Sequence, residues 1–99
     1  MNKYIWLIGE NNSLTANNNS YYFWKNIVNK NDNIEKYLVL KRNEQNRKIY
    51  NEMSDNEKKF VLWKNSYKHY KKYFDADMFF VTLSYKDVMP STILGHEIK

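Results

Sequence analysis

Four short runs of apolar residues, separated by longer polar or amphipathic stretches, limit the fold of this chain more than any other feature. The runs cover residues 3–8, 36–40, 60–63 and 78–83. They are nearly continuous rather than alternating, which is typical of strands covered on both faces of a parallel sheet. Because helical segments separate them, they predict βαβ units with right-handed crossovers. We therefore expect an α/β fold, a Rossmann-like three-layer domain with a mostly parallel four-stranded sheet and the first strand in its interior.

The stretches between these runs carry the signals of helix starts. Ser20 is a candidate N-cap for a helix over residues 21–29, and Asn43 is a candidate N-cap for a second helix. Residues 54–57 read S-D-N-E, which is the spacing of a capping box. They predict one further helical turn before the third strand.

The clearest amphipathic segment is a third helix, predicted over residues 66–75. At about 100° per residue, its aromatic residues fall on one side and its lysines on the opposite side, with His69 between them. The two sets are Tyr67, Tyr70, Tyr73 and Phe74, and Lys68, Lys71 and Lys72. We expect the aromatic side to face the core and the lysines to face solvent. The alternative is a basic face that contacts a membrane or a nucleic acid.

Size and composition favour one domain over residues 1–99. The chain is 42% hydrophobic, which is enough for a core, and no run approaches the roughly 18 apolar residues of a membrane-spanning helix. It has no cysteine, so disulfides and thiolate zinc sites are excluded. The first apolar run is too short for a signal peptide, and we expect a cytoplasmic location.

The charge balance is compatible with an anionic partner, such as nucleic acid, a nucleotide or a phosphate-rich membrane surface, and the motifs argue against several kinds of site. The 16 basic and 11 acidic residues give a formal net charge of +5. Nucleic acid is not the expected partner, because nothing resembles an RNA-recognition or helix-turn-helix signature. Neither a dinucleotide fingerprint nor a P-loop is present. The two histidines have no ligand at turn spacing, so we expect no metal and no cofactor.

Polar residues that follow the predicted strands are the candidate site. In open parallel sheets, ligands bind beyond the carboxyl ends of the strands. The candidate substrate-binding residues there are Glu10, Asn11, Arg42, Ser66 and Ser84. The alternative is that such residues only form turns and caps, with Glu10 capping a nearby helix and Arg42 solvated. No catalytic residue is predicted within this chain.

The first strand, loop and helix carry a family resemblance. The sequence reads W-L-I-G-E over residues 6–10, A-N-N-N-S over 16–20 and Y-Y-F-W-K over 21–25. This succession resembles the start of the bacterial CDP-glycerol glycerophosphotransferases, the polymerases of teichoic acid and related capsule polymers. Asn18-Asn19 stands where the family pattern has Asp-Asn. Residues 66–84 are also similar to the family's helix-and-strand unit that leads into its catalytic core.

The resemblance implies an acceptor-side part of a larger enzyme. Members of the family are GT-B type, glycosyltransferase-like proteins with a Rossmann-like N-terminal half for the acceptor and a C-terminal half for the CDP-linked donor. Their His-Gly catalytic motif is missing, because His69 precedes Tyr70 and His96 precedes Glu97. The chain is therefore expected to be the N-terminal part of a longer transferase and inactive alone.

The implied reaction transfers glycerol phosphate from CDP-glycerol to a cell-wall or capsule polymer. Glu10 would orient a polyol hydroxyl, and Arg42 would pair with a phosphate of the polymer. The implied partners are the nucleotide-linked donor, bound through the C-terminal domain, the polymer acceptor, and the inner face of the cell membrane. Separated from its other domain, the chain would also self-associate through the uncovered surface. The competing hypothesis is a self-contained, flavodoxin-like binding module without catalysis.

Overall fold

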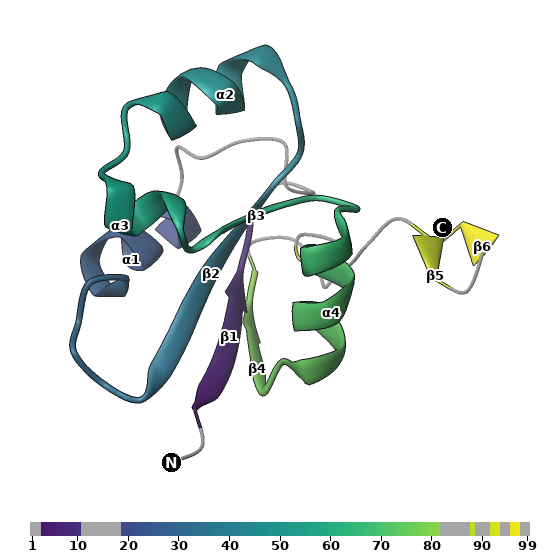
Figure 1. Ribbon diagram of the computed structural model, residues 1–99, viewed down its shortest axis with the longest axis horizontal. Helices are drawn as coiled ribbons and strands as arrows, with labels where there is room; N and C mark the ends of the chain where they lie inside the picture. Colours follow the sequence, from purple (N-terminus) through teal and green to yellow (C-terminus); the bar gives the residue numbers. More distant parts are fainter. Residues whose placement is uncertain (1–2, 11–18, 82–87, 89–91, 94–95, 98–99) are drawn as a thin grey trace.

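A four-stranded parallel sheet forms the centre of the computed structural model (Figure 1). The structure describes residues 3–10, 19–81, 88, 92–93 and 96–97. The strands are β1 (Tyr4–Ile8), β2 (Ile34–Leu40), β3 (Val61–Trp63) and β4 (Met78–Phe80). Their order is β3-β2-β1-β4 and every pair is parallel. The predicted α/β class, the four strands and the interior position of β1 are confirmed.

Helices cover both faces of this sheet and make a three-layer, Rossmann-like arrangement. Three of them lie on one side and α4 lies on the other (Figure 1). The helices are α1 (Asn19–Ile27), α2 (Glu44–Asn51), α3 (Asp55–Lys58) and α4 (Tyr67–Asp75). Among the residues that the structure describes, no helix has both the length and the apolar character needed to cross a bilayer.

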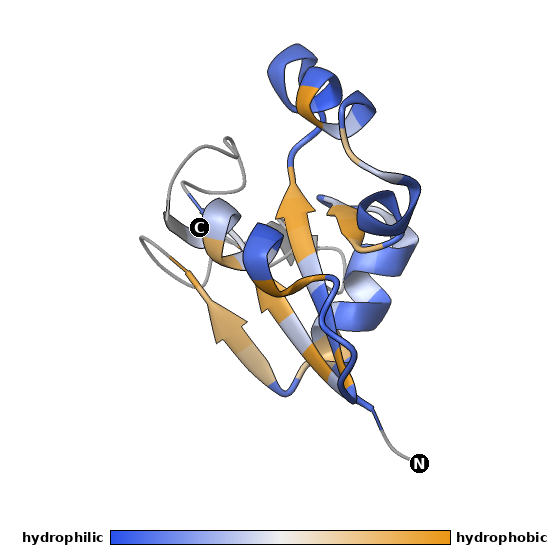
Figure 2. Cartoon of the chain, turned by 90° about the vertical axis from the view of Figure 1, so that its left-hand side faces the viewer, coloured by the Kyte–Doolittle hydropathy of each residue, from blue (hydrophilic) through white to orange (hydrophobic). Residues whose placement is uncertain are grey.

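Two apolar clusters, one on each face, explain why the strand sequences are continuous rather than alternating. On the α1 face, strand residues such as Ile8 and Leu38 pack with the fully buried Trp24. On the α4 face, Leu7 and Val39 pack in a second cluster. Since successive residues of one strand point to opposite faces, both sets must be apolar. Accordingly, the strands are mostly orange and the helices mostly blue in Figure 2.

Trp24 joins α1 to the sheet by packing and by a hydrogen bond. Its side chain is fully buried, and its Nε1 donates to the backbone carbonyl of Lys36 at 2.9 Å. The Lys36 side chain, also buried, pairs with Asp32 at 2.6 Å. The Asp32 carboxylate therefore balances the positive charge of Lys36, which is buried within strand β2.

The helix starts agree with the capping signals at two of three positions. Asn43 accepts from the Asn46 N–H at the start of α2, and Ser54 and Glu57 form the predicted capping box. The expectation that Ser20 caps the first helix is wrong, because α1 begins at Asn19 and Ser20 lies in its first turn. The carboxylate of Glu10 accepts the Tyr21 N–H there instead.

Removing the hydroxyl of Ser54 tests the capping box. The Ser54→Ala variant should lose about 1 kcal/mol of unfolding free energy, because the Glu57 N–H loses its acceptor. Urea denaturation followed by circular dichroism measures this change. Ser54→Thr retains the acceptor and should stay closer to the wild type. Equal stabilities for the Ala and wild-type chains would contradict the role of the cap.

The orientation of α4 corrects the sequence-based assignment of its faces. Tyr67 is 83% exposed and Phe74 is 63% exposed, whereas His69 is fully buried. The inward stripe runs through His69, Lys72, Tyr73 and Ala76, the i, i+3, i+4 and i+7 positions, all of which are buried or half-buried. The expectation that the aromatic side faces the core is confirmed for Tyr73, which packs against the core, and is wrong for Tyr67 and Phe74. A histidine with hydrogen-bond partners occupies the centre of the buried face instead.

A short hairpin lies near the end of the chain, where no element was expected. Strands β5 (Thr92–Ile93) and β6 (His96–Glu97) pair antiparallel. Each strand has two residues, so neither can produce a recognisable periodicity.

Candidate functional site at the carboxyl edge of the sheet

The carboxyl ends of β1, β2 and β3 bring three of the predicted site residues to one edge of the sheet. Glu10 follows β1, Arg42 follows β2 and Ser66 follows β3. The strand order places the connection from β3 to β4 across β1 and β2, so the direction of winding reverses between β1 and β4. Such a reversal is where open α/β sheets bind ligands.

Glu10 is buried at this reversal and caps helix α1. It is fully inaccessible to solvent, and its Oε1 accepts from the Tyr21 N–H at 2.8 Å. The preceding Gly9 extends the β1–β4 pairing by donating to the Phe80 carbonyl at 3.0 Å. A carboxylate at a helix N-terminus interacts favourably with the helix dipole. The same position holds phosphate groups in nucleotide-binding folds, so Glu10 makes the start of α1 unsuited to a nucleotide phosphate.

Arg42 stands exposed on a short, well-anchored loop. Its guanidinium lies over the Trp63 ring, 5.3 Å from the centroid. The Lys41 carbonyl accepts from the Asn46 side chain at 2.9 Å, and Asn43 caps the helix that follows. These contacts fix the backbone on both sides of Arg42. The arrangement leaves a positioned cation with planar donors at the edge, which suits a phosphate or carboxylate ligand.

Two lysines lie beside Arg42 on neighbouring strand ends. Leu40 pairs with Trp63 in the β2–β3 ladder, and the Lys64 N–H donates to the Leu40 carbonyl at 2.7 Å. Lys41 and Lys64 therefore leave the sheet next to each other. We call Lys41, Arg42 and Lys64 the basic edge. Sequence reasoning placed all three at strand ends but selected only Arg42, because the pairing register was not known.

Ser66 is the N-cap of α4, and its loop is tied to His69. The Ser66 hydroxyl oxygen accepts from the His69 N–H at 3.2 Å. Asn65 has a positive φ of 68°, a conformation that asparagine tolerates better than most residues, and its N–H donates to His69 Nδ1 at 2.9 Å. The capping role that sequence reasoning offered as the alternative for Ser66 is therefore present.

His69 joins this loop to the chain beyond β4. Its Nε2 lies 2.5 Å from the Val88 carbonyl oxygen. Since Nδ1 accepts a hydrogen bond, Nε2 carries the proton and donates to Val88, and the imidazole is neutral. Burial lowers the pKa of His69 to about 4, and the charge of Lys64 also lowers it, against the opposing effect of the Val88 hydrogen bond. The sequence placed His69 between the aromatic side and the lysine side of this helix, and its burial in the core was not predicted.

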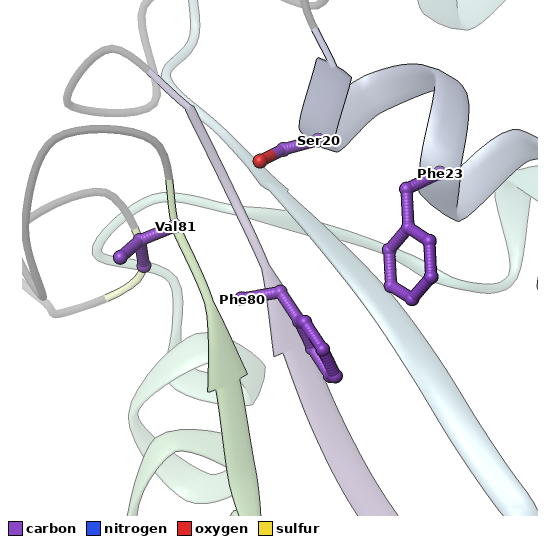
Figure 3. Close-up of a pocket in the computed structure, with 4 residues that line it drawn as sticks. All are labelled: Ser20, Phe23, Phe80 and Val81. Atoms are coloured by element: carbon purple, nitrogen blue, oxygen red, sulfur yellow. The ribbon is translucent and has the colours of Figure 1, made fainter.

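A shallow, mainly apolar depression opens between α1 and β4. It measures about 220 Å³ and is lined by Ser20, Phe23, Phe80 and Val81 (Figure 3). The Phe23 and Phe80 rings lie with their centroids 4.9 Å apart, while Val81 points away from them. No polar motif marked these residues in the sequence, and their proximity follows only from the β1–β4 pairing.

Asn11 and Ser84 lie outside the described residues. Within residues 3–10, 19–81, 88, 92–93 and 96–97, no group of three or more His, Asp or Glu residues could hold a metal ion.

Comparison of the chain with protein-family models, with curated proteins and with solved structures gives no match.

Proposed function

We propose that this chain is the acceptor-side part of a glycerophosphotransferase of the CDP-glycerol type. The observation that carries the proposal is the basic edge, three cations on adjacent strand ends of a Rossmann-like sheet. Such an edge suits a polymer that repeats phosphate and polyol groups. Arg42 would pair with a phosphate, and the half-buried Ser66 would contact a hydroxyl group, whereas the buried Glu10 would hold the start of α1 in place rather than touch the polymer. The chain alone would hold no complete catalytic centre.

In the proposed reaction, a hydroxyl of the polymer attacks the β-phosphorus of CDP-glycerol. The new bond joins the polymer oxygen to phosphorus, and the bond from that phosphorus to CMP breaks. The proton of the attacking hydroxyl passes to a base outside this chain. The contribution of the basic edge would be to position the polymer, because positioning and charge stabilisation supply much of the rate in phosphoryl transfer.

Glu10 supports placing the donor on another domain. Its carboxylate occupies the helix N-terminus that would otherwise attract a diphosphate. A nucleotide bound at that position would bring two anions together. The acceptor is therefore the better ligand for this edge, and the CDP-linked donor would bind the second domain of a GT-B enzyme.

Among the residues that the structure describes, no strand pairs with the outer edge of β4, and this supports attachment of further structure. Met78 is 48% exposed, Phe79 39% and Val81 38%, although all belong to or follow a strand of the sheet. Strands of parallel sheets are normally covered on both faces. We propose that the remainder of a longer enzyme covers β4, and that the separated chain would self-associate through this edge. The proposed location is cytoplasmic, at the inner face of the cell membrane.

Titration of the isotope-labelled chain with a short glycerol phosphate oligomer tests the proposed acceptor site. Backbone amide shifts should change at Lys41, Arg42 and Lys64. The Arg42→Ala variant should weaken binding by about tenfold or more, because a charge-assisted contact is lost. Lys30→Ala, a change before β2 at the opposite edge of the sheet, is the matched control and should bind like the wild type.

Two further measurements complete this test. An uncharged polyglycerol of the same length should bind much more weakly, since it offers no phosphate to Arg42. The chain alone should release no CMP from CDP-glycerol. Equal binding of both oligomers, or equal weakening by Lys30→Ala and Arg42→Ala, would contradict the acceptor site and favour a binding module of another specificity.

A further inference from the structure

Helix α4 presents to solvent an aromatic pair set among lysines. Tyr67 and Phe74 are 83% and 63% exposed, and they are seven residues apart, which is two helical turns on one face. Lys71 lies four residues after Tyr67 on the same face and is exposed. These residues point away from the sheet, because the stripe centred on His69 faces inward.

Further lysines add positive charge to this face. Lys68 is exposed, and its Nζ lies 3.5 Å from the backbone carbonyl oxygen of Lys59 and 5.6 Å from the centroid of the Tyr37 ring. The backbone of the exposed Lys59 therefore borders this face. Asp75 is the exposed acid at the end of the helix. The inner Lys72 is already paired with Glu35 at 3.5 Å. We call Tyr67, Lys68, Lys71 and Phe74, with Lys59, the α4 surface.

We propose that the α4 surface binds an anionic lipid bilayer. Tyrosine and phenylalanine side chains enter the headgroup region of a membrane, and lysines attract anionic headgroups. The three lysines against one aspartate make this face complementary to such a surface. Single aromatic side chains separated by lysines suit a headgroup layer better than a protein partner, which needs a continuous contact of about 800 Å².

The proposal does not depend on the acceptor site. The α4 surface is formed by the outward face of one helix and Lys59, whereas the basic edge is formed by the loops after β2 and β3. The two surfaces are close to each other at Ser66, because α4 starts directly after this residue at the carboxyl edge of the sheet. Binding through α4 would therefore bring that edge close to the bilayer.

Cosedimentation of the chain with lipid vesicles tests this proposal. Vesicles of phosphatidylcholine that contain about one third phosphatidylglycerol should bind the chain, and pure phosphatidylcholine vesicles should bind it far less. The Lys68→Gln/Lys71→Gln variant should bind roughly 25-fold more weakly, since each lysine near an anionic surface contributes about fivefold. The Tyr67→Ser/Phe74→Ser variant should also lose binding, and high salt should weaken binding by the wild type.

Matched controls separate the α4 surface from general charge and exposed aromatics. Lys30→Gln/Lys48→Gln removes two exposed lysines from other elements, and Tyr4→Ser/Tyr22→Ser removes aromatics that are 53% and 56% exposed. Both should bind like the wild type, and circular dichroism should show every variant folded.

Several results would overturn the proposal. They are no binding to anionic vesicles, equal binding to both vesicle types, and equal losses in the α4 and control variants. Retention on a single-stranded oligonucleotide without vesicle binding would assign the surface to nucleic acid instead. A dimer in light scattering that α4 variants abolish, again without vesicle binding, would assign it to a second copy. The acceptor titration contains no vesicles, so either proposal can fail while the other stands.

Discussion

Replacement of Trp24 by alanine is expected to lower the unfolding free energy by about 3–5 kcal/mol, the range for removal of a large buried aromatic side chain. Trp24 is fully buried against the α1 face of the sheet. Its removal also takes the Nε1 donor from the Lys36 carbonyl. Since domains of this size are stable by about 5–15 kcal/mol, much of the population should be unfolded at modest urea concentrations. Urea denaturation followed by far-ultraviolet circular dichroism measures the change.

Two variants show which property of Trp24 matters. Trp24→Phe keeps an aromatic ring but has no N–H, so its stability should fall between those of the alanine variant and the wild type. Tyr22→Ala changes an aromatic residue on the same helix that is 56% exposed, and its effect should stay within about 0.5 kcal/mol. If Trp24→Ala were as stable as Tyr22→Ala, α1 would not pack on the sheet through this side chain.

The strands could be predicted because a strand that is buried on both faces has a recognisable sequence pattern. Residues Leu38–Leu40 are all fully buried, yet they alternate between the two apolar clusters. A strand of this kind has no polar side, so it reads as a continuous apolar run. Its start was less visible, since β2 begins at Ile34 and carries the buried Lys36, whose charge is paired with Asp32.

The faces of α4 could not be predicted in the same way. Hydropathy ranks tyrosine and phenylalanine as better core residues than histidine, but it contains no term for a specific hydrogen bond. His69 is buried because the Asn65 N–H and the Val88 carbonyl satisfy its two ring nitrogens. One partner is four residues before His69 and the other is 19 residues after it. The second requires the full tertiary fold.

The candidate site was predicted in position but only partly in detail. Parallel strands deliver their carboxyl ends to one edge, so the location of Glu10, Arg42 and Ser66 follows from the fold class. The contact from Glu10 to Tyr21 spans 11 residues and depends on how α1 returns to the sheet. The place of Arg42 over Trp63 likewise depends on β2–β3 register. Neither the Glu10–Tyr21 hydrogen bond nor the Arg42–Trp63 contact can be predicted from a local sequence pattern.

His69 should make the stability of the chain depend on pH in a defined range. Burial lowers its pKa in the folded chain to about 4, whereas the unfolded value is near 6.5. The unfolded chain therefore binds more protons between these values. Stability should be highest above about pH 6.5 and should fall as the pH decreases toward 4, by roughly 3 kcal/mol in total. The slope should approach about 1.4 kcal/mol per pH unit in the middle of this range.

A variant without a titrating group isolates this contribution. His69→Phe should be less stable than the wild type at pH 7, because the Asn65 N–H and the Val88 carbonyl lose their partner. The difference in unfolding free energy between the two chains should shrink as the pH falls from 6.5 to 5. Only the wild type loses stability through His69, because its imidazole binds a proton when the chain unfolds. The lowered carboxyl pKa values of Glu35 and Glu57 remove stability only at lower pH, and they do so in both chains. Parallel pH profiles for His69→Phe and the wild type would show that His69 is not the buried neutral group that joins α4 to Val88.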